Sequence, residues 1–416
     1  MGLWNSQKAI SMSIVSNLPS CSEIALAHSQ KLQAIIREEI KSAGGWIPFA
    51  RYMELALYQP GLGYYNGGAV KLGGEGDFIT APEISPLFGC TLARQIIQIL
   101  EQVKAQCDQA DILEFGAGSG KLANDLLQEL ERNDCLPQQY YILEVSAELR
   151  ERQQRFLTEN APHLMSRIVW LEQLPDKFFG AIVANEVIDA MPVHLVEWQG
   201  NTSFERGVIW REQKNSHGGS FDWENRPIDD ASLKAVADNL IQWFNPQFDP
   251  GFSYVSEINL AAGYFMHSLA KMLQLGAAII IDYGFGRSEY YHSQRSQGTL
   301  MCHYRHHAHG DPFYLPGLQD ITSHVDFSTL FEAADEAGLV LTGYTTQAHF
   351  LMNCGITEIL SRIPTEDMQQ YLPLANQLQK LVSPAEMGEL FKVIAFAKAI
   401  DQPFNGFSGG DKSRLL

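Results

Sequence analysis

From residue 111 onward, short apolar runs alternate with stretches in which apolar residues recur at a helical period. The apolar runs predict seven strands, at residues 111–116, 139–145, 167–171, 180–185, 277–283, 340–347 and 391–398. Residues 182–185 and 277–283 are apolar at almost every position, which is typical of central strands covered on both faces. The alternation predicts an α/β fold with a doubly wound sheet.

The first hundred residues follow a different pattern. A helix is predicted from Glu23 to about Ser42, where two glycines end it. A second helix is predicted after Ser85, which can cap it with Pro86 at the first position. Its apolar or small positions form one stripe, suited to burial against a core: Gly89, Leu92, Ala93, Ile96, Ile99, Leu100 and Val103.

These patterns predict a division of the chain. Residues 1–22 are expected to be a flexible tail, 23–105 a helical and glycine-rich N-terminal lid region, 106–400 the core and 401–416 a C-terminal tail. Insertions are expected in the core at about 194–255 and 290–330. Within the first insertion, Trp, Val and Phe alternate with polar residues over 194–226, which predicts an antiparallel hairpin.

The first core strand leads directly into the spacing Gly116-x-Gly118-x-Gly120, and a helix-forming stretch follows. A strand, glycine turn and helix bring the backbone close to a nucleotide-like ligand. Dinucleotide sites use Gly-x-Gly-x-x-Gly, whereas here the third glycine comes one residue early. Glu114 would repel a phosphate but suits the amino and sulfonium groups of S-adenosylmethionine. We therefore predict S-adenosylmethionine as cofactor, bound by Glu114, Gly116, Ala117, Gly118 and Gly120.

The second core strand ends in Glu144, 24 residues after Gly120. A carboxylate there can accept hydrogen bonds from both ribose hydroxyls, as the acidic residue of dinucleotide folds does. The alternative is a surface acid at a strand end with no ligand.

The fourth core strand ends in Asn185, followed by Glu186 and Asp189. Ligands of open α/β sheets bind at the carboxyl ends of the strands. If residues 186–190 form one helical turn, the two acids face the same way. Two carboxylates and an amide suit a guanidinium group, so these three residues are the predicted catalytic group. A polar turn without a ligand remains the alternative.

Residues 302–309, CHYRHHAH, contain four histidines. Zinc ligands usually recur at characteristic intervals, whereas this cluster is irregular and Arg305 in its middle opposes a cation. We predict no metal here; a polar substrate loop is favoured, and a solvated loop without a ligand stays open.

The composition of the chain limits the kinds of molecule that it is expected to bind. The chain has 416 residues, of which 45% are hydrophobic and 19% charged, and its net charge is −18. The negative charge disfavours nucleic acid and favours a cationic substrate or a basic protein segment. No apolar stretch is long enough for a membrane span. The six cysteines are scattered, which suggests a reducing compartment, and no targeting segment is evident. A cytoplasmic location is expected.

Several blocks together resemble the MidA-type S-adenosylmethionine-dependent methyltransferases, whose mitochondrial members are complex I assembly factors that methylate a protein arginine. The blocks run in order between about residues 40 and 400: 76–89, 113–120, 141–146, 185–194, 281–284, 298–300, 304–307 and 316–327.

The resemblance implies a class I methyltransferase core, a Rossmann-like seven-stranded sheet with helices on both faces, and a 60–90 segment folded over the active site. It implies that Val145, Gly76, Asp77 and Thr80 join the glycine turn and Glu144 on the donor side. On the substrate side it places Pro82, Glu83, Asp282, Tyr283, His306 and His307 with the 185–189 turn.

The sequence thus predicts a methyltransferase for a protein side chain. The resemblance implies arginine as that side chain and a link to respiratory complex assembly. Three alternatives remain. The chain could be an assembly or chaperone protein that binds the donor with little catalysis, or a small-molecule methyltransferase. A nucleotide-dependent oxidoreductase is disfavoured by the early third glycine and by Glu114.

Overall fold

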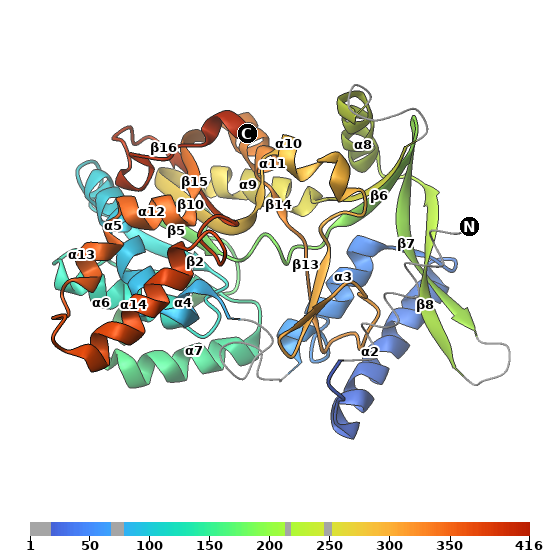
Figure 1. The fold of residues 1–416 in the computed structure, drawn as a ribbon, viewed down its shortest axis with the longest axis horizontal. Coiled ribbons are helices and arrows are strands. Elements are labelled where there is room, and N and C mark those ends of the chain that lie inside the picture. The colour runs from blue at the N-terminus through green and yellow to red at the C-terminus, as the bar shows by residue number, and fades with distance from the viewer. Residues whose placement is uncertain (1–17, 68–78, 213–217, 245–251) are drawn as a thin grey trace. The chain divides into compact units, whose positions relative to one another are not determined.

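The computed structural model describes residues 18–67, 79–212, 218–244 and 252–416. The chain divides into two compact units (Figure 1). Unit 1 comprises residues 1–78, 190–261 and 288–324, and unit 2 comprises 79–189, 262–287 and 325–416. Both expected insertions fall largely within unit 1.

This division differs from the predicted one at two places. Residues 79–105, expected in the N-terminal region, belong to unit 2 because their apolar stripe is buried in its core. Residues 401–416, expected as a tail, are tied to unit 2 by hydrogen bonds. The Gly406 N–H donates to Gln95 Oε1 at 2.9 Å, and the Lys412 N–H donates to the Tyr344 carbonyl at 2.7 Å.

Unit 2 is built on one sheet with the strand order β15-β16-β10-β5-β2-β3-β4. The strands are β2 (Asp111–Phe115), β3 (Tyr140–Leu143), β4 (Ile168–Leu171), β5 (Phe178–Asn185), β10 (Leu273–Phe285), β15 (Val340–Thr346) and β16 (Phe391–Lys398). The short β14 (Val325–Asp326) pairs with β10. All seven predicted strands form, although β5 and β10 begin earlier than expected. From β10 to β4 the neighbours are parallel, whereas β16 is antiparallel to both β10 and β15.

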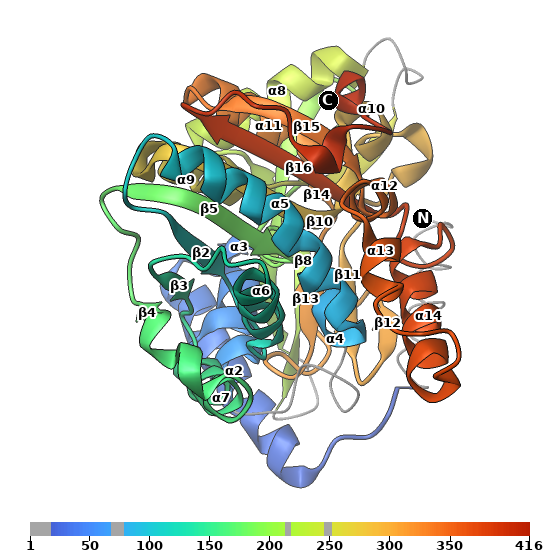
Figure 2. The same cartoon turned by 90° about the vertical axis from the view of Figure 1, so that its left-hand side faces the viewer.

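Helices cover both faces of this sheet, which confirms the predicted α/β fold. One face packs against helices that include α5 and α6, which lie in front of the strands in Figure 2. On the other face, Phe115 of β2 meets Phe265 of α9 edge to face, with ring centroids 5.0 Å apart. The helices are α4 (Ala81–Ile84), α5 (Pro86–Lys104), α6 (Lys121–Arg132), α7 (Ala147–Asn160), α9 (Leu260–Met272, whose first two residues belong to unit 1), α11 (Phe327–Glu336), α12 (Gln347–Asn353), α13 (Ile356–Leu360) and α14 (Met368–Val382).

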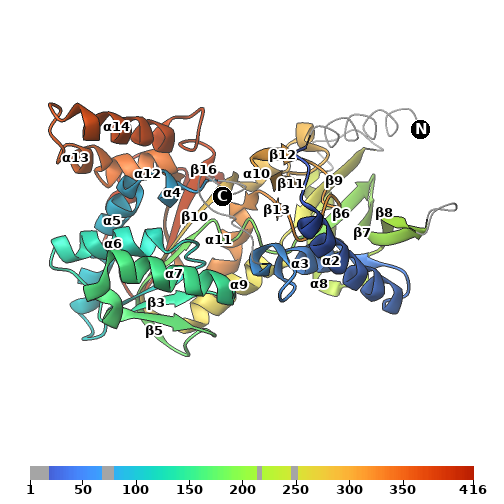
Figure 3. The same cartoon turned by 90° about the horizontal axis from the view of Figure 1, so that it is seen from below.

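Helix α5 shows why the local sequence gives this packing. The Ser85 hydroxyl caps it by accepting the Leu87 N–H at 3.3 Å. A Cβ on Gly89 would lie 2.7 Å from the Cβ of Asp125 in α6, so a glycine is required where the two helices touch. Helices α12, α13 and α14 gather beside α5 (Figure 3).

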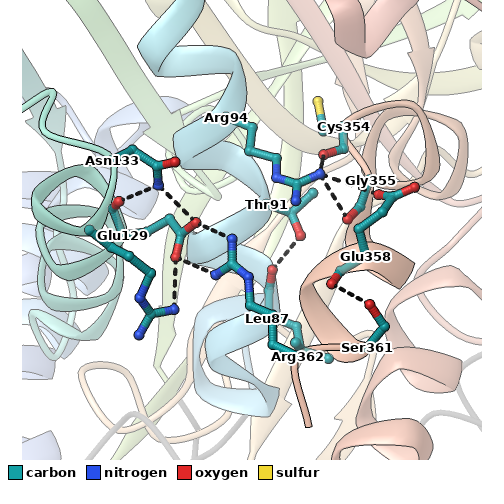
Figure 4. A network of polar contacts seen from close by, with 11 residues as sticks. Leu87, Thr91, Arg94, Glu129, Asn133, Cys354, Gly355, Glu358, Ser361 and Arg362 are labelled. Carbon is teal, nitrogen blue, oxygen red and sulfur yellow. Dashed lines mark hydrogen bonds and ion pairs between the residues drawn. The ribbon is translucent and has the colours of Figure 1, made fainter.

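A buried carboxylate fastens α6 to the segment that follows α13 (Figure 4). The side chain of Glu129 has no exposed surface. Its two oxygens accept hydrogen bonds of 2.7 Å from both terminal nitrogens of Arg362, and Arg132 donates a further one at 3.2 Å. Burial alone would raise the pKa of Glu129, but the hydrogen bonds and the two positive charges outweigh it and leave the pKa lowered. This acid is therefore ionised and structural.

Unit 1 contains an antiparallel sheet in the order β1-β7-β6-β9, with β8 paired to β7. The expected hairpin over 194–226 forms as part of this larger sheet. Its strands are β1 (Ile47–Pro48), β6 (His194–Gln199), β7 (Thr202–Glu212), β8 (Gly219–Pro227) and β9 (Ser253–Ile258). A second sheet holds β11 (Met301–Tyr304), β12 (His307–His309) and β13 (Asp320–Thr322). The helices are α2 (Glu23–Ser42), with the predicted bounds, α3 (Phe49–Tyr58), α8 (Ala231–Phe244) and α10 (Arg287–Tyr290, whose first residue belongs to unit 2).

Candidate functional site

The glycine turn, residues 116–120, connects β2 to α6. Gly116, Gly118 and Gly120 have φ values of +60°, +53° and +87°. Residues with a Cβ rarely adopt this left-handed region. The Gly116 N–H donates to the Leu143 carbonyl of β3 at 3.1 Å, and the Gly120 N–H donates to the Ala117 carbonyl at 2.8 Å. The backbone itself therefore holds the turn at the carboxyl end of β2.

Helix α4 is attached to the glycine turn through Glu83. The Ser119 hydroxyl donates to the Glu83 carboxylate, and Lys121 Nζ donates to the Glu83 carbonyl at 3.1 Å. Thr80 directly precedes α4, and Pro82 is buried within it. Glu83 and Pro82 were predicted on the substrate side, yet the contacts of Glu83 are with the glycine turn. Gly76 and Asp77 lie outside the described residues.

Glu114 lies in β2 and its side chain is buried. The Tyr140 hydroxyl donates to its Oε2 at 2.8 Å. Burial raises the pKa of Glu114 to about 8; the hydrogen bond from Tyr140 opposes this shift, and the nearby charge of Glu144 adds to it. The folded chain therefore favours the protonated form of this carboxyl group more than water does.

Glu144 follows β3 and is also buried, and burial raises its pKa. Its Oε1 accepts the Ser146 N–H at 2.9 Å, and its Oε2 accepts a hydrogen bond of 3.0 Å from Gln153. A carboxylate has about four acceptor positions, so positions remain for ribose hydroxyls. The neighbouring Val145 side chain is 73% exposed, which provides an apolar surface next to the acid.

The acidic turn, residues 185–189, begins at Asn185, the last residue of β5. The helical turn considered for residues 186–190 does not form, so the condition for aligning the two acids is not met. These residues form a bend and a turn, and Glu186 has a φ of +52°, so helical i,i+3 geometry does not apply to Glu186 and Asp189. The reason is a set of hydrogen bonds with β10, in which the Glu186 N–H donates to the Ile281 carbonyl at 2.9 Å.

Asp282 of β10 holds the rest of the acidic turn. Its Oδ2 accepts the N–H groups of Ile188 at 3.0 Å and Asp189 at 3.2 Å, and its Oδ1 accepts the Tyr283 N–H at 2.8 Å. The side chain is fully buried. Burial, and then the charges of Asp189 and Glu186, raise the pKa of Asp282 well above its usual range. The structure thus gives Asp282 a role in shaping the turn, which the sequence did not predict. Tyr283 beside it packs its ring on Phe391.

The two turns are neighbours. A Cβ on Gly116 would lie 3.5 Å from Cγ2 of Val187, in the middle of the acidic turn. Asn185 Oδ1 is buried and accepts no hydrogen bond from the described residues. An acceptor of this kind, next to two carboxylates, is suited to a ligand that carries several N–H donors.

His306 and His307 belong to unit 1. His306 lies in the tight connection between β11 and β12, and His307 is the first residue of β12. Arg305 and His306, which form this connection, have φ values of +47° and +63°. His307 Nδ1 lies 2.7 Å from the Arg305 carbonyl. Their proposed place on the substrate side stays a prediction. Within the described ranges no three His, Cys, Asp or Glu side chains are arranged to hold a metal ion.

Comparison with known proteins identifies the class. Residues 91–345 match the model of a family of S-adenosyl-L-methionine-dependent methyltransferases, Methyltransf_28. The chain belongs to this family. Its methyl donor, S-adenosyl-L-methionine, is the cofactor expected from the glycine turn.

Relatives of this methyltransferase cover most of its length. The mitochondrial protein arginine methyltransferase NDUFAF7 of Danio rerio is 30% identical over 84% of this chain and 83% of the relative. NDUFAF7 of Bos taurus is 30% identical over 86% and 81%. A Burkholderia thailandensis structure with bound S-adenosyl-homocysteine is 50% identical, with a TM-score of 0.88, and the match covers 96% of this chain and 100% of that one.

These relatives come from mitochondria and from a bacterium, so the cytoplasmic location stays a prediction. In the described part of this methyltransferase, no helix combines the length and the apolar character that a membrane crossing needs.

The donor is compatible with the residues present. Gly116 of the glycine turn is exposed, Glu144 has acceptor positions to spare, and Val145 is an exposed apolar residue beside it. Sequence reasoning missed Ser119, Tyr140 and Gln153, which hold Glu83, Glu114 and Glu144 respectively. Only Ser119 could have been noticed, because it lies inside the glycine motif.

Proposed function

We propose that this methyltransferase transfers the methyl group to a guanidinium nitrogen of arginine in a protein. The observation that carries this proposal is the acidic turn, which contains Glu186, Asp189 and an Asn185 Oδ1 that accepts no hydrogen bond from the described residues. Val187 of this turn lies next to Gly116 of the glycine turn. Relatives named as protein arginine methyltransferases support it, and so does the net charge of −18, which attracts a basic protein segment.

On the donor side, the glycine turn would accommodate the methionine part of the donor, and Glu144 would accept hydrogen bonds from the ribose hydroxyls. When bound, the donor supplies an activated methyl group on a positively charged sulfur. The residues around it mainly need to align the acceptor nitrogen with that group. Such positioning can lower a barrier by about 7–11 kcal/mol.

On the acceptor side, Glu186 and Asp189 would hold the guanidinium. Its lone pairs are delocalised, which makes it a poor nucleophile. Carboxylates that draw positive charge toward the far nitrogens leave the reacting nitrogen more electron-rich. Asn185 Oδ1 would accept one of the remaining N–H groups, and Asp282 would keep the turn in place from behind.

The test uses the full chain with isotope-labelled donor and arginine-containing proteins from cell extract, followed by mapping of the labelled residue. Label on an arginine nitrogen supports the proposal. Label on another side chain or on a small molecule would show that the acceptor is not arginine. Tight donor binding without any transfer would favour a donor-binding assembly protein.

Glu186→Gln tests the acceptor side directly. Loss of one charge that acts mainly on the transition state should lower turnover by about 100-fold and leave the affinity for S-adenosylhomocysteine within about threefold, which is ~0.6 kcal/mol. Glu151→Gln is the matched control, because Glu151 is exposed on α7. Unchanged turnover in Glu186→Gln would remove this residue from the reaction.

The link to respiratory complex assembly, which the family resemblance implies, and the cytoplasmic location belong to the same proposal. It predicts that the labelled arginine lies in a subunit of a respiratory complex. Mass spectrometry of a strain that lacks this chain, compared with its parent, would show the loss of that modification.

A further inference from the structure

Gln153 of α7 joins the two elements that the proposed function assigns to the donor. Its Nε2 donates to the Gly118 carbonyl in the glycine turn at 3.0 Å and to Glu144 Oε2 at 3.0 Å. The side chain is fully buried. One amide group therefore spans the carboxyl ends of two neighbouring strands, β2 and β3.

A third contact fixes the orientation of this amide. Trp170 Nε1 lies 2.9 Å from Gln153 Oε1. An indole N–H can only donate, so the oxygen must face Trp170 and the NH₂ group must face Gly118 and Glu144. Both N–H groups of the amide are thus committed to the glycine turn and to the acid.

The close approach of α7 to the glycine turn is a separate observation. A Cβ on Gly120 would lie 3.4 Å from the Cα and 3.6 Å from the Cβ of Gln153. The start of α7 is fixed as well, because the Ser146 hydroxyl accepts the Leu149 N–H at 3.3 Å, while the Ser146 N–H donates to Glu144. Helix α7 therefore contacts the glycine turn through Gln153 and Glu144 through its N-cap residue Ser146.

We propose that Gln153 is a positioning residue for the donor. It sets the distance between the glycine turn and Glu144, and it orients the Glu144 carboxylate so that its remaining acceptor positions face the ribose hydroxyls. This inference rests on the proposed donor site and adds a determinant of its specificity for a ribose.

The experiment measures the coupling between Gln153 and a ribose hydroxyl. Isothermal titration gives the dissociation constants of S-adenosylhomocysteine and of its 2′-deoxy analogue for the wild-type chain and for Gln153→Met. This substitution keeps the length of the side chain and removes both of its N–H groups. We expect Gln153→Met to bind S-adenosylhomocysteine about tenfold more weakly, since one hydrogen bond to the Glu144 carboxyl group and one to the Gly118 carbonyl are lost. We also expect the wild-type preference for the ribose ligand to shrink several-fold.

Controls separate this role from general stability. Gln154→Met makes the same change at the next, exposed position of α7 and should leave both constants unchanged. At saturating donor, Gln153→Met should retain the wild-type kcat and the KM for the acceptor, with only the KM for the donor raised. If Gln153→Met does not fold, Gln153→Leu gives the same ratio with a shorter apolar side chain.

An unchanged ligand preference in the variant, or unchanged affinity for S-adenosylhomocysteine, would overturn the inference. A wild-type chain that binds neither ligand would instead overturn the proposed donor site itself, so the two failures are distinguishable.

Discussion

The glycine turn and the acidic turn lie at the ends of neighbouring strands, β2 and β5, yet they are held in different ways. Backbone hydrogen bonds and three left-handed glycines shape the glycine turn. The acidic turn depends on one buried side chain, Asp282, which accepts two of its N–H groups. Each turn also has a contact of the other kind, since Gln153 donates to the Gly118 carbonyl and the Glu186 N–H donates to the Ile281 carbonyl. A single buried carboxylate accepts two N–H groups of the acidic turn, so we expect this turn to be the more sensitive to the loss of one side chain.

Replacing Asp282 should have the largest effect, because it removes the side chain that accepts two N–H groups of the acidic turn. In Asp282→Ala the N–H groups of Ile188 and Asp189 lose their acceptor in a buried setting, at a cost of about 1–3 kcal/mol each. We expect the free energy of unfolding to fall by a few kcal/mol and methyl transfer to fall by about 100-fold or more. Urea denaturation and turnover measure the two effects.

Donor binding serves as the internal control for this variant. Because the glycine turn does not depend on Asp282, the affinity for S-adenosylhomocysteine should stay close to that of the wild type. Asp282→Asn keeps one acceptor oxygen, so its free energy of unfolding and its turnover should lie between those of the wild type and those of Asp282→Ala. Wild-type turnover in Asp282→Ala would show that the acidic turn holds its shape without the carboxylate.

Glu114 sharpens the comparison, because it is a buried acid next to the glycine turn. Its pKa is raised from 4.5 to about 8, so the folded chain binds this proton more tightly than the unfolded chain does. The resulting stability is fully present below pH 4.5 and is lost as the pH rises through 8. For one proton, the free energy of unfolding changes by at most ~1.4 kcal/mol per pH unit.

Glu114→Gln should remove that slope. Unfolding by urea at pH 5, 7 and 9, without donor, should give similar stabilities at pH 5 and a variant that is more stable than the wild type at pH 9. Glu151→Gln on the surface of α7 is the control and should follow the wild-type curve. Parallel curves for Glu114→Gln and the wild type would mean that Glu114 is ionised throughout.

How much of this could be predicted from the sequence depends on the range of the contacts. The seven strands, α2 and the glycine turn follow from local patterns, since the three glycines permit the left-handed φ values of a tight turn between a strand and a helix. The acidic turn was misjudged because Asp282, 93 residues after Asp189, decides its shape. Gln153 and Tyr140 escaped notice for the same reason, as their partners are distant in the chain. The assignment of 79–105 to unit 2 likewise depends on packing against α6, which no local pattern reports.

Gly120 offers the smallest and most local test. Its φ of +87° strains any residue with a Cβ, and that Cβ would also meet Gln153 of α7 at 3.4 Å. Gly200 has a φ of +58° with nothing within 4 Å, so Gly200→Ala carries the strain without the contact. Both alanine variants should lose about 1–2 kcal/mol of unfolding free energy from the strain, but only Gly120→Ala should also weaken donor binding, by several-fold. Titration with S-adenosylhomocysteine measures the difference. Equal donor affinity in the two variants would mean that the glycine turn can shift away from α7 without disturbing the donor site, and that its backbone is less constrained than its hydrogen bonds suggest.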